Sequence, residues 1–474
     1  MTTTSFRWRN WAGNQVCSPV ALEQPGTDAE LVEIAKEAAA KGTRVKVVGA
    51  GHSFTDIACT DGVQVSLDNY DRVLYVDRER ARVTVQAGIR LWALNEALAA
   101  RGLALENLGD IAYQSIAGAI STSTHGTGAN FGGLATQVVG LDLICADGSV
   151  VSCSAEEEPE TFHAARVGLG ALGVLSTVTL QCVPGYNLRA VEEPMRVDHV
   201  LEHVDEYVAE NDHFEFYWVP HTGWALTKRN NRTNDEAAGR SRFGEFRDRV
   251  LLENLAFGAT ARVGRLRPAW IPRLARILPS TGRTEYVERS YRVFASPRYV
   301  HFYEMEYSIP RQHAVTAVSQ LIDFVRTSGL QISFLSKCVS PRQMTYRCQP
   351  QPAASPPTSP FTSTAACPTS STSAAWKRSW TSWTDVRTGA NSTTSQLRHW
   401  PRSIPSGTSG RAFGAGWTLT VASPTPTPSA CSDRSPLHER AAPAALPIRP
   451  AARGRAGLLP GRERHPFATA GRLA

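Results

Sequence analysis

The sequence predicts an α+β protein made of two folded units and a disordered tail. Three observations lead to this prediction. Short β-branched runs alternate with helical patterns over residues 1–184 and again over residues 185–337. Two glycine-rich polar stretches, at residues 49–53 and 118–128, interrupt the first unit. In residues 338–474 this periodicity stops and Pro, Ser, Thr, Ala and Arg dominate, a composition with too little apolar surface to bury.

The elements of the first unit follow from the spacing of its apolar residues. Leu31, Ile34 and Ala38 recur at helical spacing, which predicts a helix over residues 29–41. Gly102 closes a second helix in the usual C-terminal glycine position. The remaining predictions, in chain order, are strands over 44–48, 63–67, 73–76 and 82–88, that second helix over 91–101, and a hairpin of 138–145 and 150–153.

The second unit is also of mixed type. Residues 214–218 and 222–228 have the pattern of strands, residues 314–328 form an amphipathic helix, and residues 330–334 predict another strand. The aromatic residues of the first of these strands are more typical of sheet packing than of a ligand cage.

The charge of the chain is unevenly distributed. Residues 338–474 hold 16 of the 50 Lys and Arg residues but 4 of the 43 Asp and Glu residues, so the tail carries +12 and the rest −5. The basic pI therefore gives no support for a nucleic-acid partner of the folded body.

Cysteine spacing and hydropathy indicate the compartment. The nine cysteines are scattered and contain no C-x-x-C pair, which argues against a zinc site and a disulfide framework and suits a reducing compartment. No stretch approaches the roughly 20 apolar residues of a membrane span, and the N-terminus lacks the apolar core of a signal peptide. We therefore expect a cytoplasmic protein without an integral membrane segment, with peripheral membrane attachment left open.

The two glycine-rich stretches predict a ligand site. Gly49 and Gly51 follow a strand and lack a Cβ, so a ligand can approach their backbone closely. Successive N–H groups in such a turn form a nest for an anion, typically a phosphate. With the polar stretch at residues 118–128, the pattern suggests a long ligand with a phosphate in its middle.

A third glycine stretch matches the sequence motif of Rossmann dinucleotide-binding domains. Residues 168–173 match G-x-G-x-x-G, and Glu192 follows about 20 residues later. A helical pattern precedes these glycines and a strand follows them, whereas the Rossmann mechanism requires strand, loop and then helix. The order excludes NAD(P) binding at this stretch.

Several stretches together point to a family. They are Trp8-Arg9-Asn10-Trp11, Val48 to Ser53, Val83 to Arg90, Gly118 to Gly128 and Trp218 to Thr222. As a set they resemble the aldonolactone oxidoreductases of the vanillyl-alcohol-oxidase-type flavoprotein superfamily, over about residues 6–334. The resemblance implies a PCMH-type FAD-binding domain over residues 1–184 and an α+β substrate cap over residues 185–337.

The resemblance also implies which residues hold FAD. In the family, the first loop and residues 121–128 bind the pyrophosphate and ribityl chain through backbone N–H and hydroxyl donors. His52 stands where many members join imidazole to the flavin 8α-methyl group, which favours covalent FAD over a merely hydrogen-bonding role. His125 would be a structural or flavin-side contact. Gly109 matches a position where glycine leaves room for O₂, which favours an oxidase. The implied cofactor-binding residues are Val48, Gly49, Ala50, Gly51, His52, Ser53, Gly109, Asp110, Ser115, Gly118, Ser121, Thr122, Thr124, His125, Gly126 and Val174.

The implied reaction is oxidation of an aldono-1,4-lactone. Hydride passes from lactone C2 to flavin N5 while the C2 hydroxyl loses its proton, and the product enolises to an ascorbate-type compound. The electron acceptor stays open between O₂ and a cytochrome or quinone. An alditol or another alcohol is the alternative substrate.

Two family motifs are missing. A Glu-x-Arg pair that holds the lactone should follow Phe334, but the chain continues Leu335-Ser336-Lys337-Cys338, and the closing H-W-G-K is also absent. No catalytic residue can therefore be assigned in this chain. Loss of one base after the codon for Phe334 would convert F-P-V-E-V-R into the present residues. The same shift restores H-W-G-K within residues 379–395. A frameshifted tail, and hence an FAD-binding remnant with little turnover, is the second hypothesis.

Overall fold

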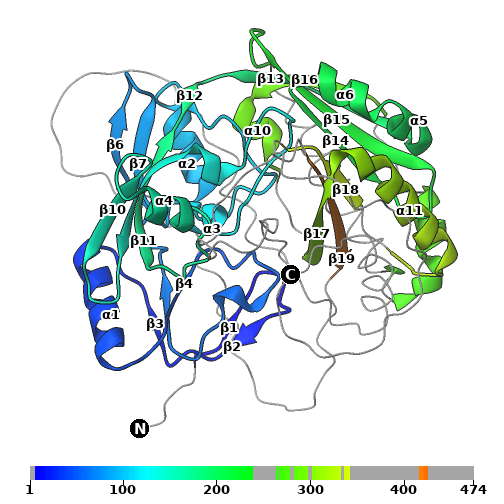
Figure 1. Cartoon of the computed structure of the whole chain (residues 1–474). Helices are drawn as coiled ribbons and strands as arrows, with labels where there is room; N and C mark the ends of the chain where they lie inside the picture. Colours follow the sequence, from blue (N-terminus) through cyan, green and yellow to red (C-terminus); the bar gives the residue numbers. More distant parts are fainter. Residues whose placement is uncertain are drawn as a thin grey trace, which may run out of the picture. The chain divides into compact units, whose positions relative to one another are not determined.

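The computed structural model in Figure 1 describes residues 6–238, 263–264, 266–277, 282–296, 301–332, 336–341 and 416–424. All of these belong to one compact unit, Met1–Pro426, whereas the second unit, Thr427–Ala474, lies outside the described residues. Sheets of three, five and seven strands carry the described part of the fold.

The three-stranded parallel sheet opens the N-terminal half of the described chain, which the resemblance predicts to bind FAD and which we call the FAD-binding half. It has the order β3 (Ala21–Glu23), β5 (Val63–Ser66), β4 (Val45–Val48). Helix α1 (Asp28–Ala40) begins at a capping box in which Thr27 and Glu30 satisfy each other's backbone N–H groups. Strands β1 (Trp8–Arg9) and β2 (Val16–Cys17) pair beside this sheet, and η1 (Asp56–Ala58) follows β4.

The five-stranded antiparallel sheet holds the main core. Its order is β10 (Val150–Ser154), β9 (Val138–Ile144), β11 (Val174–Gln181), β7 (Arg82–Gln86), β6 (Val73–Asp77). Apolar side chains of these strands and of the helices form one buried cluster. The accompanying elements are α2 (Leu91–Ala99), β8 (Leu103–Ala104), α3 (Ile116–Ser121), η2 (Leu134–Gln137), α4 (Pro159–Ala165) and β12 (Val183–Pro184).

The seven-stranded antiparallel sheet forms the cap. Its order is β16 (Thr284–Arg289), β13 (Asn187–Arg196), β15 (Trp224–Thr233), β14 (His213–Trp218), β18 (Ser336–Val339), β19 (Gly416–Pro424), β17 (Phe302–Pro310). Helices α5 (Val197–Glu202), α6 (Val204–Glu210) and α11 (Ala314–Thr327) cover one face (Figure 1). The remaining elements are η4 (Pro268–Trp270), α9 (Ile271–Ile277), α10 (Ser290–Phe294) and η5 (Arg311–His313).

Strand alternation gives the cap sheet two different faces. Because successive side chains of a strand point to opposite faces, Phe214, Phe216 and Trp218 enter the core beneath α5, α6 and α11. Glu215 and Tyr217 therefore point away from those helices, toward the FAD-binding half. Cys338 joins the helix-side core in the same way, while its neighbour Lys337 faces the opposite side.

The structure confirms most predicted elements and changes two in the C-terminal part. The strand expected over residues 330–334 is instead β18, because residues 330–332 are irregular and residues 333–335 lie outside the described part. Two segments of the predicted tail, Cys338–Val339 and Gly416–Pro424, are strands of the cap sheet. They link β14 to β17, which would not otherwise belong to one sheet. Residues 340 and 341 are also described; the rest of the tail lies outside the described residues.

Candidate functional site

A cleft opens where strand β4 ends. The empty space between its lining atoms is about 800 Å³, with the open solvent at its mouth included. Ten predicted cofactor-binding residues line it, and they come from both glycine-rich stretches. They are Val48, Gly49, Ala50, Gly51, His52, Ser53, Ser115, Gly118, Ser121 and Thr122.

The first glycine is required by close packing between the two stretches. A Cβ at Gly49 would lie 2.4 Å from Ser115 Oγ. Ser115 is the N-cap of α3, and its Oγ accepts a hydrogen bond from the Gly118 N–H. The first loop therefore sits directly on the start of α3, and both contribute to one wall of the cleft.

The N-terminal segment explains the Trp8-Arg9-Asn10-Trp11 motif. The Trp11 N–H donates to the Gly51 carbonyl at 2.8 Å, and Asn10 Nδ2 donates to the Ser53 carbonyl at 3.0 Å. Gly51 has φ +67°, a left-handed conformation that favours glycine. These bonds hold the first loop in place from outside the cleft.

His52 is the reactive candidate of this loop. Its Nδ1 is buried and has no hydrogen-bond partner among the described residues, and its ring lies 4.9 Å from the Trp11 ring. Burial, with the nearby Arg90 and His301, lowers the pKa of His52 to about 4. The imidazole is therefore neutral at pH 7 and keeps a lone pair for a ligand.

The third glycine stretch belongs to the same cleft. Helix α4 precedes it and β11 follows it, so the Rossmann order is absent as predicted. Leu169, Gly170 and Gly173 nevertheless line the cleft, and Lys46 Nζ donates to the Leu169 carbonyl at 2.9 Å. Sequence reasoning gave these residues no role. Val174, which the resemblance placed at the cofactor, is buried in the core beside Gly173 and does not line the cleft.

The other predicted residues form a second cluster. A Cβ at Gly126 would lie 2.1 Å from the Leu108 carbonyl oxygen, and one at Gly109 would lie 3.2 Å from Thr124 Cγ2. The segments around Gly109 and Gly126 are therefore packed backbone to backbone. Asp110 and His125 extend from these segments toward the cap sheet.

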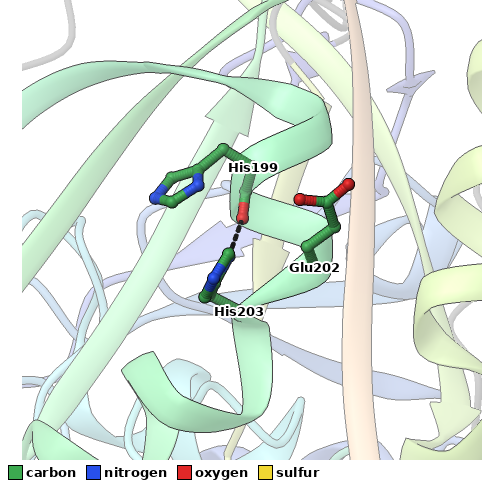
Figure 2. Close-up of side chains that lie close together, drawn as sticks. All are labelled: His199, Glu202 and His203. Carbon is green, nitrogen blue, oxygen red and sulfur yellow. Dashed lines mark hydrogen bonds between the residues drawn. The ribbon is translucent and has the colours of Figure 1, made fainter.

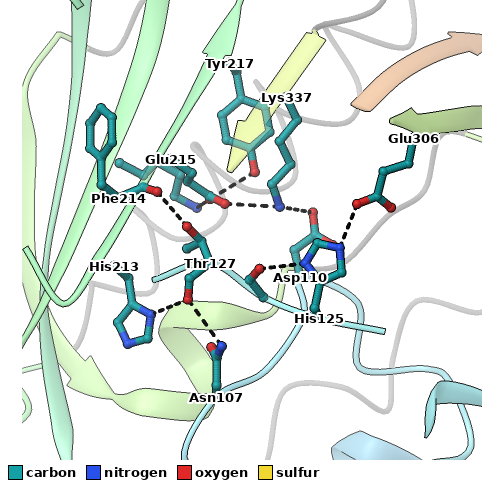
Figure 3. A network of polar contacts seen from close by, with 12 residues as sticks. Asn107, Asp110, His125, Thr127, His213, Phe214, Glu215, Tyr217, Glu306 and Lys337 are labelled. Carbon is teal, nitrogen blue, oxygen red and sulfur yellow. Dashed lines mark hydrogen bonds and ion pairs between the residues drawn. The ribbon is translucent and has the colours of Figure 1, made fainter. Parts of the chain in front are cut away.

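Charged side chains of the cap sheet form ion pairs with Asp110 and His125 (Figure 3). Lys337 Nζ lies 3.1 Å from Glu215 Oε2 and 3.3 Å from Asp110 Oδ2. His125 Nε2 lies 2.6 Å from Glu306 Oε1. The FAD-binding half and the strands β14, β17 and β18 thus share one partly buried charged cluster.

The charges of this cluster are set by their partners. Burial favours neutral forms, but Asp110 and Glu215 outweigh it and hold the pKa of Lys337 well above its usual value. In the same way, Glu306 outweighs burial and raises the pKa of His125, while His125 lowers that of Glu306. Burial raises the pKa of Tyr217, which donates to Glu215, to about 12.

Strand β18 occupies the stretch where the resemblance predicts a Glu-x-Arg pair. This strand pairs with β14 and carries Ser336, Lys337, Cys338 and Val339, with neither Glu nor Arg. Its one charged side chain is Lys337. Sequence reasoning missed Lys337, Glu215 and Glu306, although the alternation of β14 could have indicated Glu215.

Comparison with known proteins identifies the family. Residues 178–346 match the D-arabinono-1,4-lactone oxidase family, and residues 19–154 match the FAD binding domain family. The L-gulono-1,4-lactone dehydrogenase of Mycobacterium tuberculosis is 44% identical over 331 residues, which cover 69% of this chain and 76% of that protein. This chain belongs to the aldonolactone oxidoreductases. The L-gulonolactone oxidase of Mus musculus is 37% identical, over 66% of this chain and 72% of that protein.

Solved structures support the same fold for this aldonolactone oxidoreductase. Cholesterol oxidase from Brevibacterium sterolicum superimposes with a TM-score of 0.63 at 14% identity, over 90% of this chain and 80% of that chain. A solvent-stable cholesterol oxidase gives 0.61 at 15% identity, over 71% and 72%. These likenesses show the vanillyl-alcohol-oxidase-type fold.

The cleft suits the cofactor that this fold carries. The tight approach at Gly49, the hydroxyl groups of Ser53, Ser121 and Thr122, and the unpaired His52 Nδ1 together offer hydrogen-bonding groups to a phosphate-containing ligand. FAD is therefore the cofactor of the family domain that residues 19–154 match. None of the helices in the described part of the chain combines the length and apolar character that a bilayer crossing requires.

Proposed function

We propose that this protein oxidises an aldono-1,4-lactone at C2 to an ascorbate-type product. One observation carries the proposal. The stretch from Gly118 to Gly126 lines the cofactor cleft through Ser121 and Thr122 and then delivers His125 to the charged cluster at the cap sheet. A cofactor site and a polar substrate site on one stretch suit an oxidation of a hydroxylated ligand. The relatives named for gulonolactone and arabinonolactone support a lactone.

In this proposal the residues of the chain bind, orient and balance charge. Bound FAD would supply the two-electron acceptor that the reaction requires. The first loop and α3 would hold its phosphates, and His52 would carry the covalent link. Lys337 would stabilise the negative charge that develops on the C2 oxygen, since a fixed cation in a partly buried site acts strongly on such charge. The carboxylate of Glu306, held in place by His125, would accept a hydrogen bond from a lactone hydroxyl group and orient it, and the released proton would pass to solvent.

One observation favours a second candidate, an FAD-binding protein with little turnover. Strand β18 presents Lys337 where the family motif has Glu-x-Arg, and both carboxylates facing Lys337 are already paired with it. Misplaced groups in a reaction site lower rates heavily. Both candidates predict bound flavin; they differ in lactone oxidation.

Anaerobic flavin bleaching separates the candidates. The full chain, loaded with FAD, is mixed without O₂ with L-gulono-1,4-lactone and, separately, with an alditol such as xylitol. Bleaching by the lactone supports the proposed reaction, and bleaching by the alditol alone would overturn the substrate class. Stable oxidised flavin with both substrates would establish the FAD-binding candidate.

We also propose that the reading frame shifts after Phe334. The comparison with the Mycobacterium tuberculosis relative leaves about a quarter of that protein unmatched. Resequencing the codons for Gln331 to Val339 tests this proposal. An additional base that restores F-P-V-E-V-R would support it, and confirmation of the present codons would refute it.

We propose O₂ as the electron acceptor, because Gly109 matches a family position where glycine leaves room for O₂. A Cβ at Gly109 would press on Thr124 Cγ2 and lie 3.3 Å from the His125 carbonyl oxygen, so alanine would narrow the space there. Photoreduced flavin in the Gly109→Ala variant should reoxidise more slowly in air than in the wild type. Equal rates would favour a cytochrome or quinone.

A further inference from the structure

A histidine pair with a carboxylate lies on the outer face of the cap, far along the chain from the cofactor loops. His199 and Glu202 belong to α5, and His203 stands between α5 and α6 (Figure 2). One ligand atom from each of the three side chains lies within 4.8 Å of the others. We propose that His199, Glu202 and His203 bind one divalent transition-metal ion, of which Zn²⁺ is the best match.

The helices fix the three side chains on one surface. Val197, Val200 and Val204 are buried in the core beneath the cap sheet, whereas His199 and Glu202 are exposed. Residues separated by three or four positions lie on the same face of a helix. The buried valines therefore anchor the backbone that presents the proposed ligands to solvent.

The two histidines are already oriented as metal ligands. His203 Nδ1–H donates to the His199 carbonyl at 3.0 Å, which leaves the lone pair on Nε2 (Figure 2). Tyr207 Oη donates to Met195 Sδ at 3.5 Å, so its oxygen can accept from His199 Nε2–H at 3.2 Å. That arrangement leaves the lone pair of His199 on Nδ1. Metal-binding histidines typically use their other ring nitrogen in this way, which fixes tautomer and ring orientation.

Tyr207, which contacts His199, is itself held by the core of the cap. Its ring stacks on Phe214 with centroids 5.1 Å apart, and Phe214 is buried under the helices. Glu202 makes no hydrogen bond or ion pair with any described residue, so its carboxylate is available. Two imidazoles and one carboxylate are a ligand set of zinc, with water completing the coordination.

Zinc binding requires the three ligand atoms to move slightly closer together. Tetrahedral zinc with bonds of about 2.1 Å separates its ligand atoms by about 3.4 Å, against the widest separation of up to 4.8 Å here. The ligands lie at the surface, so side-chain rotation can close this gap without moving the helices. The backbone bond from His203 and the contact of Tyr207 would remain.

The test is titration of the full chain with Zn²⁺ after chelator treatment, followed by calorimetry. We expect the wild type to bind one equivalent of Zn²⁺. The affinity for Zn²⁺ should fall at least about tenfold in His199→Gln, His203→Gln and Glu202→Gln. In Tyr207→Phe, which removes the hydroxyl group that orients His199, the affinity should fall about 10–100-fold. The matched control His313→Gln, another histidine of the cap, should bind like the wild type. Circular dichroism identifies variants that fold.

Co²⁺ distinguishes these ligands from the cysteines. Bound to nitrogen and oxygen donors it gives no sulfur-to-metal charge-transfer band, whereas cysteine ligation does. Absence of stoichiometric binding, a sulfur band, or equal affinity in folded Glu202→Gln and His313→Gln would each overturn the proposal. The assay contains no lactone and no acceptor, and the site is separate from the cofactor cleft.

Discussion

At the scale of single residues, the buried Nδ1 of His52 is the feature that best fits the predicted cofactor site. A buried polar atom without a partner costs about 1–3 kcal/mol, and in the described part of the chain this nitrogen has none. Its low pKa keeps the ring neutral. Both features fit a residue whose partner is the cofactor. The sequence indicated His52 through its place in the loop, but only the structure shows that the atom is unpaired.

His52→Ala should abolish covalent flavin attachment. In the wild type we expect flavin absorbance to remain with protein precipitated by acid, whereas the variant should release all of it. Gln114→Ala, which alters another residue of the same cleft, is the matched control and should retain the attached flavin. Release of flavin from the acid-precipitated wild type would contradict the covalent link.

Lys337→Met should destabilise the protein strongly. The change leaves Asp110 and Glu215 without their shared cation, and breaking such a buried pair costs about 3 kcal/mol. Urea unfolding followed by fluorescence measures the change. Lys41→Met removes a cation from an exposed pair with Glu37 and should leave the midpoint unchanged. Similar midpoints for both variants would show that the cluster adds no stability.

At the scale of elements, alternation and close packing place the site. Strand β14 presents Phe214 and Phe216 to the helices and Glu215 and Tyr217 to the charged cluster. Its aromatic run was correctly predicted as sheet packing. The sequence predicted no helix at the second glycine stretch, yet residues 118–121 belong to helix α3 (Ile116–Ser121), which Ser115 caps. Short helices with few apolar positions give a weak periodic signal.

Gly49→Ala should impair FAD binding through a clash between elements. The new Cβ would lie 2.4 Å from Ser115 Oγ but 3.5 Å from Ser115 Cβ, an ordinary contact distance. The double variant Gly49→Ala/Ser115→Ala should therefore recover part of the binding, although loss of the helix cap costs about 1 kcal/mol. The flavin content after reconstitution with FAD measures binding in the single and the double variant. Failure of the double variant to recover any flavin would place the defect elsewhere than at Ser115.

At the scale of the molecule, ion pairs join the two halves of the protein, and the pair of His125 and Glu306 is one of them. His125 comes from the glycine stretch of the FAD-binding half, and Glu306 comes from β17 of the cap. Partners 181 positions apart in the chain cannot be paired by sequence spacing. The pair therefore ties the second cofactor stretch to the sheet that faces it.

His125→Gln should destabilise the protein in a pH-dependent way. Since the pKa of folded His125 is raised above its ordinary 6.5, the contribution of His125 is complete below that value and is lost as the pH rises through the folded pKa. The lowered pKa of Glu306 keeps its carboxylate ionised down to acidic pH. The difference in unfolding free energy between wild type and variant should thus be larger at about pH 6 than at about pH 9. A difference that grows toward alkaline pH would refute the assignment.

The sequence by itself determined the α+β class, the absence of the Rossmann order at the third glycine stretch and the family, and it predicted a phosphate-binding turn at Gly49 to Ser53. These rest on local features, namely apolar periodicity, glycine placement and motif order, which act within a few residues of one another. Only the tertiary structure decided that Leu169 and Gly170 line the same cleft as Gly49, that Val174 is buried, and that β18 brings Lys337 to Asp110 and Glu215. Those outcomes depend on strand pairing between distant segments. The apolar periodicity of a single segment does not indicate which distant segment it pairs with.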